Sequence, residues 1–215
     1  MMRLLGYFRS SSSYRCRIAL NLKGLAYENA PVNLRAGAQH EPDFERINPQ
    51  CLVPALVTDE GHALHQSLAI IEWLDETHPA PPLLPAEPDL RAAVRGFAQT
   101  IACEIHPLQN LRVLEYLSGE LGVDAGRKSA WLAHWIGEGL AACEDLLARR
   151  AENTKFCFGD TPGLADICLV PQIYSAARFG VDIGALTRIN DIHQRCEALP
   201  AFAEAHPARQ PDYRE

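Results

Sequence analysis

Four consecutive serines, Ser10 to Ser13, directly follow Arg9 near the start of the chain. A serine hydroxyl can accept a hydrogen bond from the first turn of a helix, and the start of a helix carries partial positive charge. Hydroxyl groups, unpaired amides and a neighbouring arginine together stabilise an anion, and a thiolate is one such anion. The same serines could also serve only to cap a helix, so this segment alone leaves both interpretations open.

The flanking sequence predicts the elements that position these serines. The apolar run at residues 4–8 is typical of a short buried strand. After the serines, Ile18, Leu20 and Leu22 indicate a helix that Gly24 can end. The serines are therefore expected at a strand-to-helix turn.

Two further segments could present backbone or hydroxyl groups to a ligand. Val53-Pro54 opens an apolar run that is typical of a strand, and a cis bond there would free the Val53 amide and carbonyl, although an ordinary trans bond is the alternative. Gln66-Ser67 opens a predicted helix, where a carboxylate can bind or the serine can simply cap. Together with the serine turn, these sites suit an extended peptide with a central thiol and a terminal carboxylate, such as glutathione.

The pattern of elements changes along the chain. Residues 1–79 mix predicted strands (4–8, 27–32, 52–57 and 62–64) with helices (18–24, 42–47 and from Gln66), and Pro31 favours an edge position for the second strand. Residues 80–88 contain four prolines and are expected to form a linker. Residues 89–215 show only helical patterns, at 90–105, 108–117, 129–150, 164–179 and 189–199, with a polar tail from Ala205 expected to lie extended on the surface. We expect an α/β, thioredoxin-like domain followed by an all-α domain.

Composition excludes several classes of protein. The net charge is −7 and the pI is near 5.6, which disfavours a nucleic-acid partner. The N-terminal apolar run is too short for a signal peptide, and no stretch approaches a membrane span. The cysteine count is odd and no pair has C-x-x-C spacing, so a disulfide framework or a zinc site is disfavoured and reduced thiols in the cytoplasm are expected. The cysteines are Cys16, Cys51, Cys103, Cys143, Cys157, Cys168 and Cys196.

Several ordered segments resemble the zeta class of the glutathione S-transferases, the family of the maleylacetoacetate isomerases and the related maleylpyruvate isomerases. The resemblance covers essentially the whole chain. It rests on residues 7–20 with the serine turn, 48–56 with Val53-Pro54, 65–72 with Gln66-Ser67, and 103–114, with shorter matches at 169–172, 178–179 and 209–212. It implies the fold of that family, a thioredoxin-like domain joined to a helical bundle, and a homodimer.

The resemblance also implies a reaction, the glutathione-dependent cis–trans isomerisation of maleylacetoacetate. A thiolate that adds to the alkene makes a single bond, rotation follows, and elimination restores a double bond of trans geometry. Maleylpyruvate and small α-haloacids are alternative substrates, and Leu111 favours maleylacetoacetate because a maleylpyruvate isomerase can carry arginine there. A non-catalytic glutathione-binding module is disfavoured because the serines and basic residues are present, and a disulfide oxidoreductase because the turn holds no cysteine.

The site residues that the resemblance implies fall into three groups. Ser10 is the first candidate for the catalytic contact to sulfur, followed by Ser11 and Ser12. Arg9, Arg178 and Arg112 are candidates for binding the dicarboxylate substrate, with Arg9 and Arg178 each contributed by one domain. Glutathione itself is expected at Ser10, Ser11, Ser12, Ser13, Tyr14, Arg15, Gln39, Val53, Gln66, Ser67, His106, Asn110, Leu111 and Arg112.

Two positions depart from the family pattern. The family commonly has cysteine where Ser12 stands, so a soft, acidic side chain is absent there. Gly163 stands where the family usually has serine or threonine in a capping box with Asp166. Glycine is a tolerable cap, so we interpret this box as structural.

Overall fold

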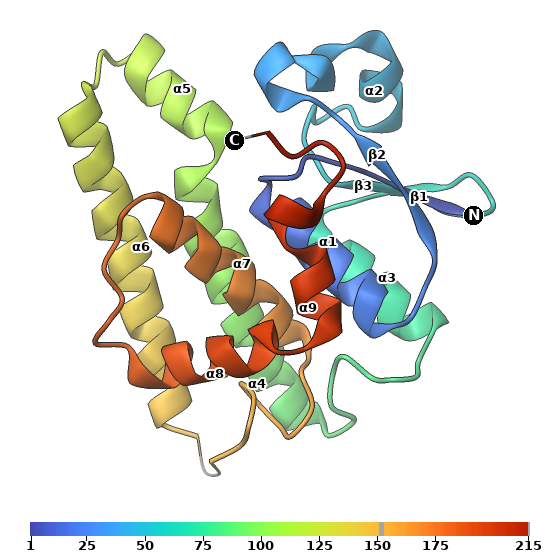
Figure 1. The fold of residues 1–215 in the computed structure, drawn as a ribbon, viewed down its shortest axis with the longest axis vertical. Coiled ribbons are helices and arrows are strands. Elements are labelled where there is room, and N and C mark those ends of the chain that lie inside the picture. Colours follow the sequence, from blue (N-terminus) through green and yellow to red (C-terminus); the bar gives the residue numbers. More distant parts are fainter. Residues whose placement is uncertain (151–152, 215) are drawn as a thin grey trace. The chain divides into compact units, whose positions relative to one another are not determined.

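The computed structural model describes residues 1–150 and 153–214 and divides the chain into two compact units. The first unit comprises residues 1–83 together with the C-terminal segment that begins at Ala198, and the helical unit comprises Leu84–Glu197. The first unit contains a small mixed sheet with helices and the second is helical (Figure 1). The predicted fold class, α/β followed by all-α, is confirmed.

The sheet of the first unit has four strands in the order β2-β1-β3-β4. Strand β1 (Met2–Gly6) is central, parallel to β2 (Tyr27–Pro31) and antiparallel to β3 (Ala55–Val57), and β4 (Ala63–His65) completes a hairpin with β3. The central position of β1 explains its apolar sequence, because both faces of a central strand are covered. Pro31 ends the edge strand β2, as its missing amide predicts.

Helices cover the two faces of this sheet (Figure 1). Helices α1 (Ser11–Leu22) and α3 (Ser67–Thr77) lie on one face, and α2 (Pro42–Ile47) lies on the other after two short helical turns, Leu34–Ala36 and Ala38–His40. Successive side chains of a strand point to opposite faces, so neighbouring residues of β1 serve different cores. Leu5 accordingly joins the small core that contains Phe44 of α2.

The C-terminal segment differs from the expectation of an extended tail in the second domain. Helix α9 (Pro200–Ala205) and a final helical turn (Pro207–Arg209) belong to the first unit, and α9 packs against α1. Phe202, Ala205 and Pro207 are buried there. The physical reason is that this stretch carries enough apolar side chains to bury a face, although polar residues and prolines surround them.

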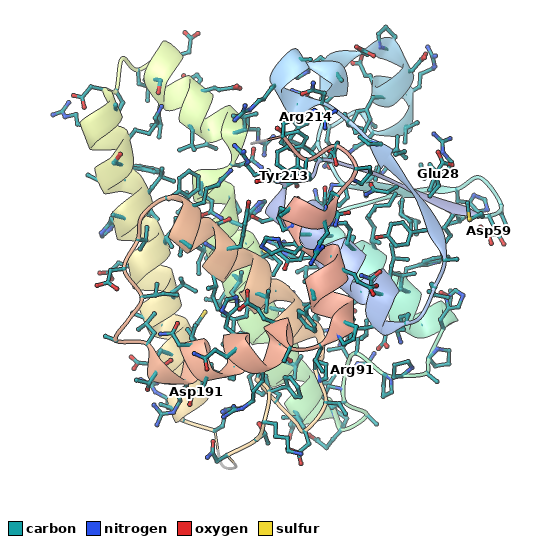
Figure 2. All side chains as sticks on the ribbon, in the orientation of Figure 1. Glu28, Asp59, Arg91, Asp191, Tyr213 and Arg214 are labelled. Carbon is teal, nitrogen blue, oxygen red and sulfur yellow. The ribbon has the colours of Figure 1, made fainter. Side chains whose placement is uncertain are left out.

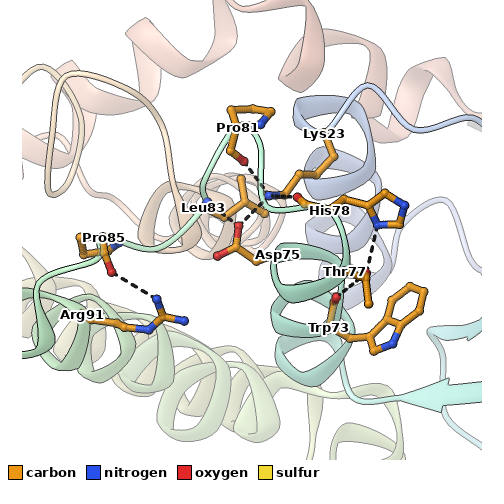
Figure 3. Close-up of polar contacts among 9 residues, drawn as sticks. All are labelled: Lys23, Trp73, Asp75, Thr77, His78, Pro81, Leu83, Pro85 and Arg91. Atoms are coloured by element: carbon orange, nitrogen blue, oxygen red, sulfur yellow. Dashed lines mark hydrogen bonds and ion pairs between the residues drawn. The ribbon is translucent and has the colours of Figure 1, made fainter.

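A buried ion pair holds the beginning of the linker (Figure 3). Lys23 Nζ, at the end of α1, donates to Asp75 Oδ1 of α3 at 2.6 Å and to the carbonyl oxygens of His78 and Pro81 at 2.7 and 2.6 Å. Asp75 Oδ1 also accepts the amide of Leu83 at 2.7 Å. Both charged side chains are almost fully buried, so the pair fixes residues 78–83 to the first unit. The boundary between the units then falls inside the predicted linker, after Leu83.

The first helix of the helical unit is α4 (Pro88–Gln99), whose Arg91 donates to the carbonyl of Pro85 (Figure 3). Among the described residues, no helix is both long and apolar enough to cross a membrane. The predicted helix at 108–117 begins later, because Pro107 lies in a tight turn and Asn110 caps the next helix. The elements of the helical unit are α4 (Pro88–Gln99), a π-helical turn (Thr100–Ile105), a 3₁₀ turn (His106–Gln109), α5 (Leu111–Gly119), α6 (Ala125–Ala148), α7 (Leu164–Arg178) and α8 (Thr187–Glu197).

Candidate functional site

The serine turn forms the N-terminus of α1, as the sequence predicts. Ser10 has extended backbone angles, and its Oγ accepts the amide of Ser13 at 3.2 Å, which makes it the N-cap. The first turn of α1 contains no acidic residue, so no carboxylate there offsets the partial positive charge of the helix end. The turn therefore retains the electrostatic character that stabilises an anion.

A chain of hydroxyl groups joins this turn to the Val53-Pro54 segment. Ser12 Oγ donates to the carbonyl of Val53 at 3.1 Å, and Ser10 Oγ lies 3.0 Å from Ser12 Oγ. A hydroxyl has one proton, so with the Ser12 proton directed to Val53 it is Ser10 that donates to Ser12. Of the two alternatives that the sequence left open, the Val53-Pro54 bond is cis. The Val53 carbonyl, however, is not left free as we expected, because it accepts this bond from Ser12.

The third predicted segment starts α3 beside the same helix. Gln66 has φ +67°, a region that residues other than glycine rarely adopt and that is found disproportionately at binding sites. Its side chain donates to Gln50 Oε1 at 3.0 Å. Ser67 is buried, and its Oγ accepts Nη1 of Arg15, on α1, at 2.9 Å. Arg15 is itself buried, so this predicted ligand residue links α1 and α3 from inside the unit.

The remaining predicted residues of the first unit divide into those in the core and those nearer its surface. Ser13 and Tyr14 have buried side chains, and Ser13 Oγ accepts the amide of Tyr7 at 3.4 Å. Ser11 is also buried, whereas Arg9 is half-buried with its guanidinium 5.1 Å from the Phe8 ring centre. The assignment of these residues to glutathione or substrate stays a prediction.

Gln39 offers a test of whether the site suits glutathione. Its side-chain Oε1 is buried and has no hydrogen-bond partner within the described part of the chain. A buried acceptor without a donor is costly, so such an atom needs a donor from a water molecule or a ligand. An amide or ammonium group of a peptide would supply that donor, so the residues present fit glutathione.

The helical unit brings together four predicted residues around one tight connection. His106 opens the 3₁₀ turn, and Asn110 Oδ1 caps α5 by accepting the amide of Arg112 at 3.3 Å, with Leu111 exposed between them. Arg178 ends α7 elsewhere in the unit and is exposed, with its guanidinium 4.2 Å from the Phe179 ring centre. The Asn110 side chain thus has a structural role besides the predicted contact to glutathione.

Three side chains that the sequence analysis did not select as site residues hold this connection in place. Gln109 and Gln172 of α7 exchange two amide hydrogen bonds, of 2.9 and 3.2 Å, and both are buried. Trp131 of α6 donates its indole N–H to the carbonyl of Leu108 at 2.7 Å. Both glutamines lie within the segments that match the family, 103–114 and 169–172, and the structure shows that they pair.

Three of the cysteine side chains are kept from forming a thiolate by burial. All seven lie within the described residues and are free thiols, five of them buried. Burial raises the pKa of the Cys143 thiol to about 12, and burial likewise raises the pKa values of Cys157 and Cys196. These three thiols stay protonated at neutral pH. In residues 1–150 and 153–214 no cluster of three or more metal-ligating side chains occurs.

The box at the start of α7 has the structural character predicted for it. Asp166 accepts the amides of Gly163 and Cys157, both at 2.9 Å, and is buried. Burial raises the pKa of this carboxyl, while the two amide bonds oppose the rise. Its oxygens are thus committed to the backbone.

Comparison with known proteins agrees with this geometry. Residues 9–77 match the model of the glutathione S-transferase N-terminal domain, and residues 129–205 match that of the C-terminal domain. The maleylacetoacetate isomerase of Pseudomonas aeruginosa is 51% identical over 213 residues, which cover 98% of each chain. The chain therefore belongs to the zeta class of the glutathione S-transferase family.

Solved structures give the same result. The holo structure of a maleylpyruvate isomerase, described as a bacterial zeta-class enzyme, has a TM-score of 0.96 at 46% identity and covers 99% of this chain and 100% of its own. The maleylacetoacetate isomerase of Methylobacterium extorquens AM1, solved with malonate and glutathione, has a TM-score of 0.95 at 43% identity with the same coverage.

Proposed function

We propose that this protein is a glutathione-dependent cis–trans isomerase that converts maleylacetoacetate to fumarylacetoacetate. The single observation that carries this proposal is the serine turn, where capped helix, hydroxyl groups and the cis-proline segment meet through hydrogen bonds and no cysteine takes part. Full-length similarity to curated maleylacetoacetate isomerases supports the choice of reaction.

Residues of the first unit would activate the thiol of glutathione and bind its peptide groups. Bound glutathione would supply the thiolate that adds to the alkene and leaves again after rotation. The N-terminus of α1 would lower the pKa of that thiol, and Ser10 would turn its hydroxyl proton from Ser12 to the sulfur. Ser67 and the amides at the start of α3 would bind a carboxylate, and Gln39 Oε1 would accept a donor of the peptide.

The substrate is a dianion, whereas the protein has a net charge of −7. Binding it therefore requires cationic side chains within the site. We assign Arg178 and Arg9 to its carboxylates, with Arg112 as a further candidate. Arginine suits this role because its planar guanidinium holds a carboxylate through two parallel hydrogen bonds. These cations would also stabilise the negative charge that develops on the substrate during addition.

Maleylpyruvate is a second candidate substrate, favoured by the similarity to a maleylpyruvate isomerase structure. Leu111 argues for maleylacetoacetate instead. Its side chain is 40% exposed beside Asn110. Because leucine is uncharged, this position cannot form an ion pair with a substrate carboxylate. A chain adapted to maleylpyruvate can carry arginine at this position.

The test begins with retention of the purified protein on glutathione-agarose. The absorbance change of maleylacetoacetate and of maleylpyruvate is then followed with and without glutathione. We expect turnover only with glutathione and a higher kcat/KM for maleylacetoacetate. Turnover that does not need glutathione would overturn the proposed mechanism, and a clear preference for maleylpyruvate would overturn the choice of substrate.

We also propose a cytoplasmic homodimer. The free thiols support a reducing compartment, and membership of a family that commonly pairs its subunits supports the dimer. We expect light scattering at micromolar concentration to give twice the mass of the 23.8 kDa chain. A monomer at these concentrations would contradict the assignment.

A further inference from the structure

The residue that precedes the active turn is held by the opposite end of the chain. The amide of Phe8 donates to Asp212 Oδ2 at 2.9 Å, and the carbonyl of Phe8 accepts Nη2 of Arg17 at 3.0 Å. The Phe8 ring lies edge-on to the ring of Tyr213, with centres 5.5 Å apart. Figure 2 labels Tyr213 and Arg214 at this C-terminal end. Both backbone polar groups and the ring of Phe8 are thus in contact with other parts of the first unit.

Arg17 joins the C-terminal segment to the same place. Its Nε donates to the carbonyl of Ala205 at 2.9 Å, so one guanidinium holds both Phe8 and the end of α9. Arg17 is buried, and burial lowers its pKa to about 10, opposed in part by Tyr27, Tyr14 and Asp212. It therefore remains a cation at neutral pH.

The C-terminal segment is also held by its own hydrogen bonds, so it can keep Asp212 at a fixed place relative to Phe8. Gln210 is buried, and its Nε2 donates to the carbonyls of Glu204 and His206, both at 2.9 Å. Its Oε1 accepts Nδ2 of Asn29, next to β1 on the sheet, at 3.0 Å. The segment that carries Asp212 is therefore attached to the sheet as well as to α1.

Phe8 is coupled to the residues that would act on glutathione. Arg9 and Ser10 follow it directly, the Arg9 guanidinium lies 5.1 Å from the Phe8 ring centre, and the Ser10 amide donates to the carbonyl of Tyr7 at 3.0 Å. A displacement of Phe8 would therefore shift the Ser10 hydroxyl. In enzymes generally, a misplacement of about 1 Å can lower the rate by roughly a hundredfold.

We propose that Asp212 is a positioning residue for this reaction: its carboxylate fixes the Phe8 amide and thereby the placement of Ser10 and Arg9 at the active turn. This inference rests on the proposed function, since it gives the C-terminal segment a purpose in catalysis beyond packing. It assigns Asp212 no contact with glutathione or substrate.

Three substitutions separate hydrogen bonding, position and charge. Asp212→Ala removes the acceptor, Asp212→Glu moves it by one methylene, and Asp212→Asn keeps an acceptor oxygen at the same distance but removes the charge. Asp191→Ala is the matched control, because Asp191 is an exposed acid of α8 that lies 4.0 Å from Arg195 (Figure 2). It removes a surface carboxylate that belongs to the helical unit.

The first readout needs no glutathione: amide hydrogen exchange at Phe8 to Ser10 in the unliganded protein. We expect faster exchange in Asp212→Ala and Asp212→Glu, and wild-type exchange in Asp212→Asn and the control. The second readout is kinetic. We expect kcat to fall about 10- to 100-fold in Asp212→Ala, less in Asp212→Glu, and about threefold or less in Asp212→Asn.

The third readout is the thiol titration of the protein–glutathione complex, followed by thiolate absorbance. A displaced turn should raise the pKa of that thiol in Asp212→Ala, whereas a merely structural role would change only the melting temperature. Unchanged Phe8 exchange in Asp212→Ala, or wild-type kcat and thiol pKa despite faster exchange, would overturn the inference. Should Asp212→Ala fail to fold, wild-type kcat in Asp212→Glu would overturn it instead. Absence of any glutathione-dependent turnover in the wild-type protein would refute the proposed function, while the exchange data would still show whether Asp212 positions the turn.

Discussion

Replacement of Ser10 can separate its role as a helix cap from its role as a donor to sulfur. The structure gives its Oγ two contacts, the Ser13 amide at 3.2 Å and Ser12 Oγ at 3.0 Å. Alanine at an N-cap costs about 1 kcal/mol of stability, whereas glycine costs only a few tenths. For a chain of this length, about 1 kcal/mol lowers the melting temperature by about 2–4 °C. Ser10→Ala should show this loss, and Ser10→Gly should nearly lack it.

The catalytic effect should be the same in both variants, because both lack the hydroxyl. A hydrogen bond to a charged group contributes about 1.5–3 kcal/mol, which corresponds to roughly a 10- to 150-fold loss of kcat. The same free energy would raise the pKa of the bound glutathione thiol by about 1–2 units. Since the active form is the anion, the rising limb of the pH–rate profile should move to higher pH by that amount. Glutathione binding itself should persist in both variants.

Three measurements test this: steady-state kinetics from mildly acidic to alkaline pH, thermal unfolding, and titration of the bound thiol. Wild-type kcat in Ser10→Gly, together with a loss in Ser10→Ala, would show that Ser10 only caps α1. If Ser10→Ala keeps full turnover and Ser11→Ala or Ser12→Ala loses it, the assignment of the sulfur contact is wrong.

Three other substitutions test the scaffold and the substrate site. Asp75→Asn should lower the unfolding free energy by about 3–5 kcal/mol in thermal or urea unfolding, because it leaves the buried Lys23 ammonium without its counter-charge; a loss under about 1 kcal/mol would contradict this. Gln172→Leu should cost about 1–3 kcal/mol and raise KM, because the Gln109 amide loses its partner; unchanged stability and KM would show that the pair is dispensable. Arg178→Lys should raise KM and lower kcat with little change in glutathione affinity, because lysine keeps the charge without the planar guanidinium; equal kinetics would exclude Arg178 as a substrate ligand.

Local features of the site could be predicted because their causes are local. The serine cap of α1, the ending of that helix near Gly24, the edge strand with Pro31 and the short helix at 42–47 all follow from the preferences of single residues. Pro54 likewise made a cis bond possible at its own position, although the choice of cis over trans came from the backbone access that bound glutathione would need. In each case the residue type restricts the backbone at its own position.

Contacts between residues far apart in the sequence could not be predicted. Ser12 and Val53 are 41 positions apart, and Phe8 and Asp212 are 204 apart, with no periodicity that relates them. The polar, proline-bearing tail indicated an extended surface segment, because the pattern does not reveal that Asp212 can satisfy a backbone amide of another element. Arg15 was expected to contact glutathione, and its hydrogen bond to Ser67, 52 positions along the chain, could not be predicted.

The distribution of charge and thiols suits a site in which the nucleophilic thiolate belongs to a bound cofactor and not to a cysteine of the chain. Burial keeps the thiols of Cys143, Cys157 and Cys196 protonated, so they would neither compete for substrate nor form mixed disulfides with glutathione readily. The N-terminus of α1, free of acidic residues in its first turn, is meanwhile available to an anion that the chain itself does not supply. A cysteine at position 12 would place a thiol beside this helix end, where its own pKa would fall. With Ser12 there instead, the turn itself holds no thiol, so the stabilisation that it offers a thiolate suits a thiol that binds from solution, and this is the chemistry that glutathione-dependent isomerisation requires.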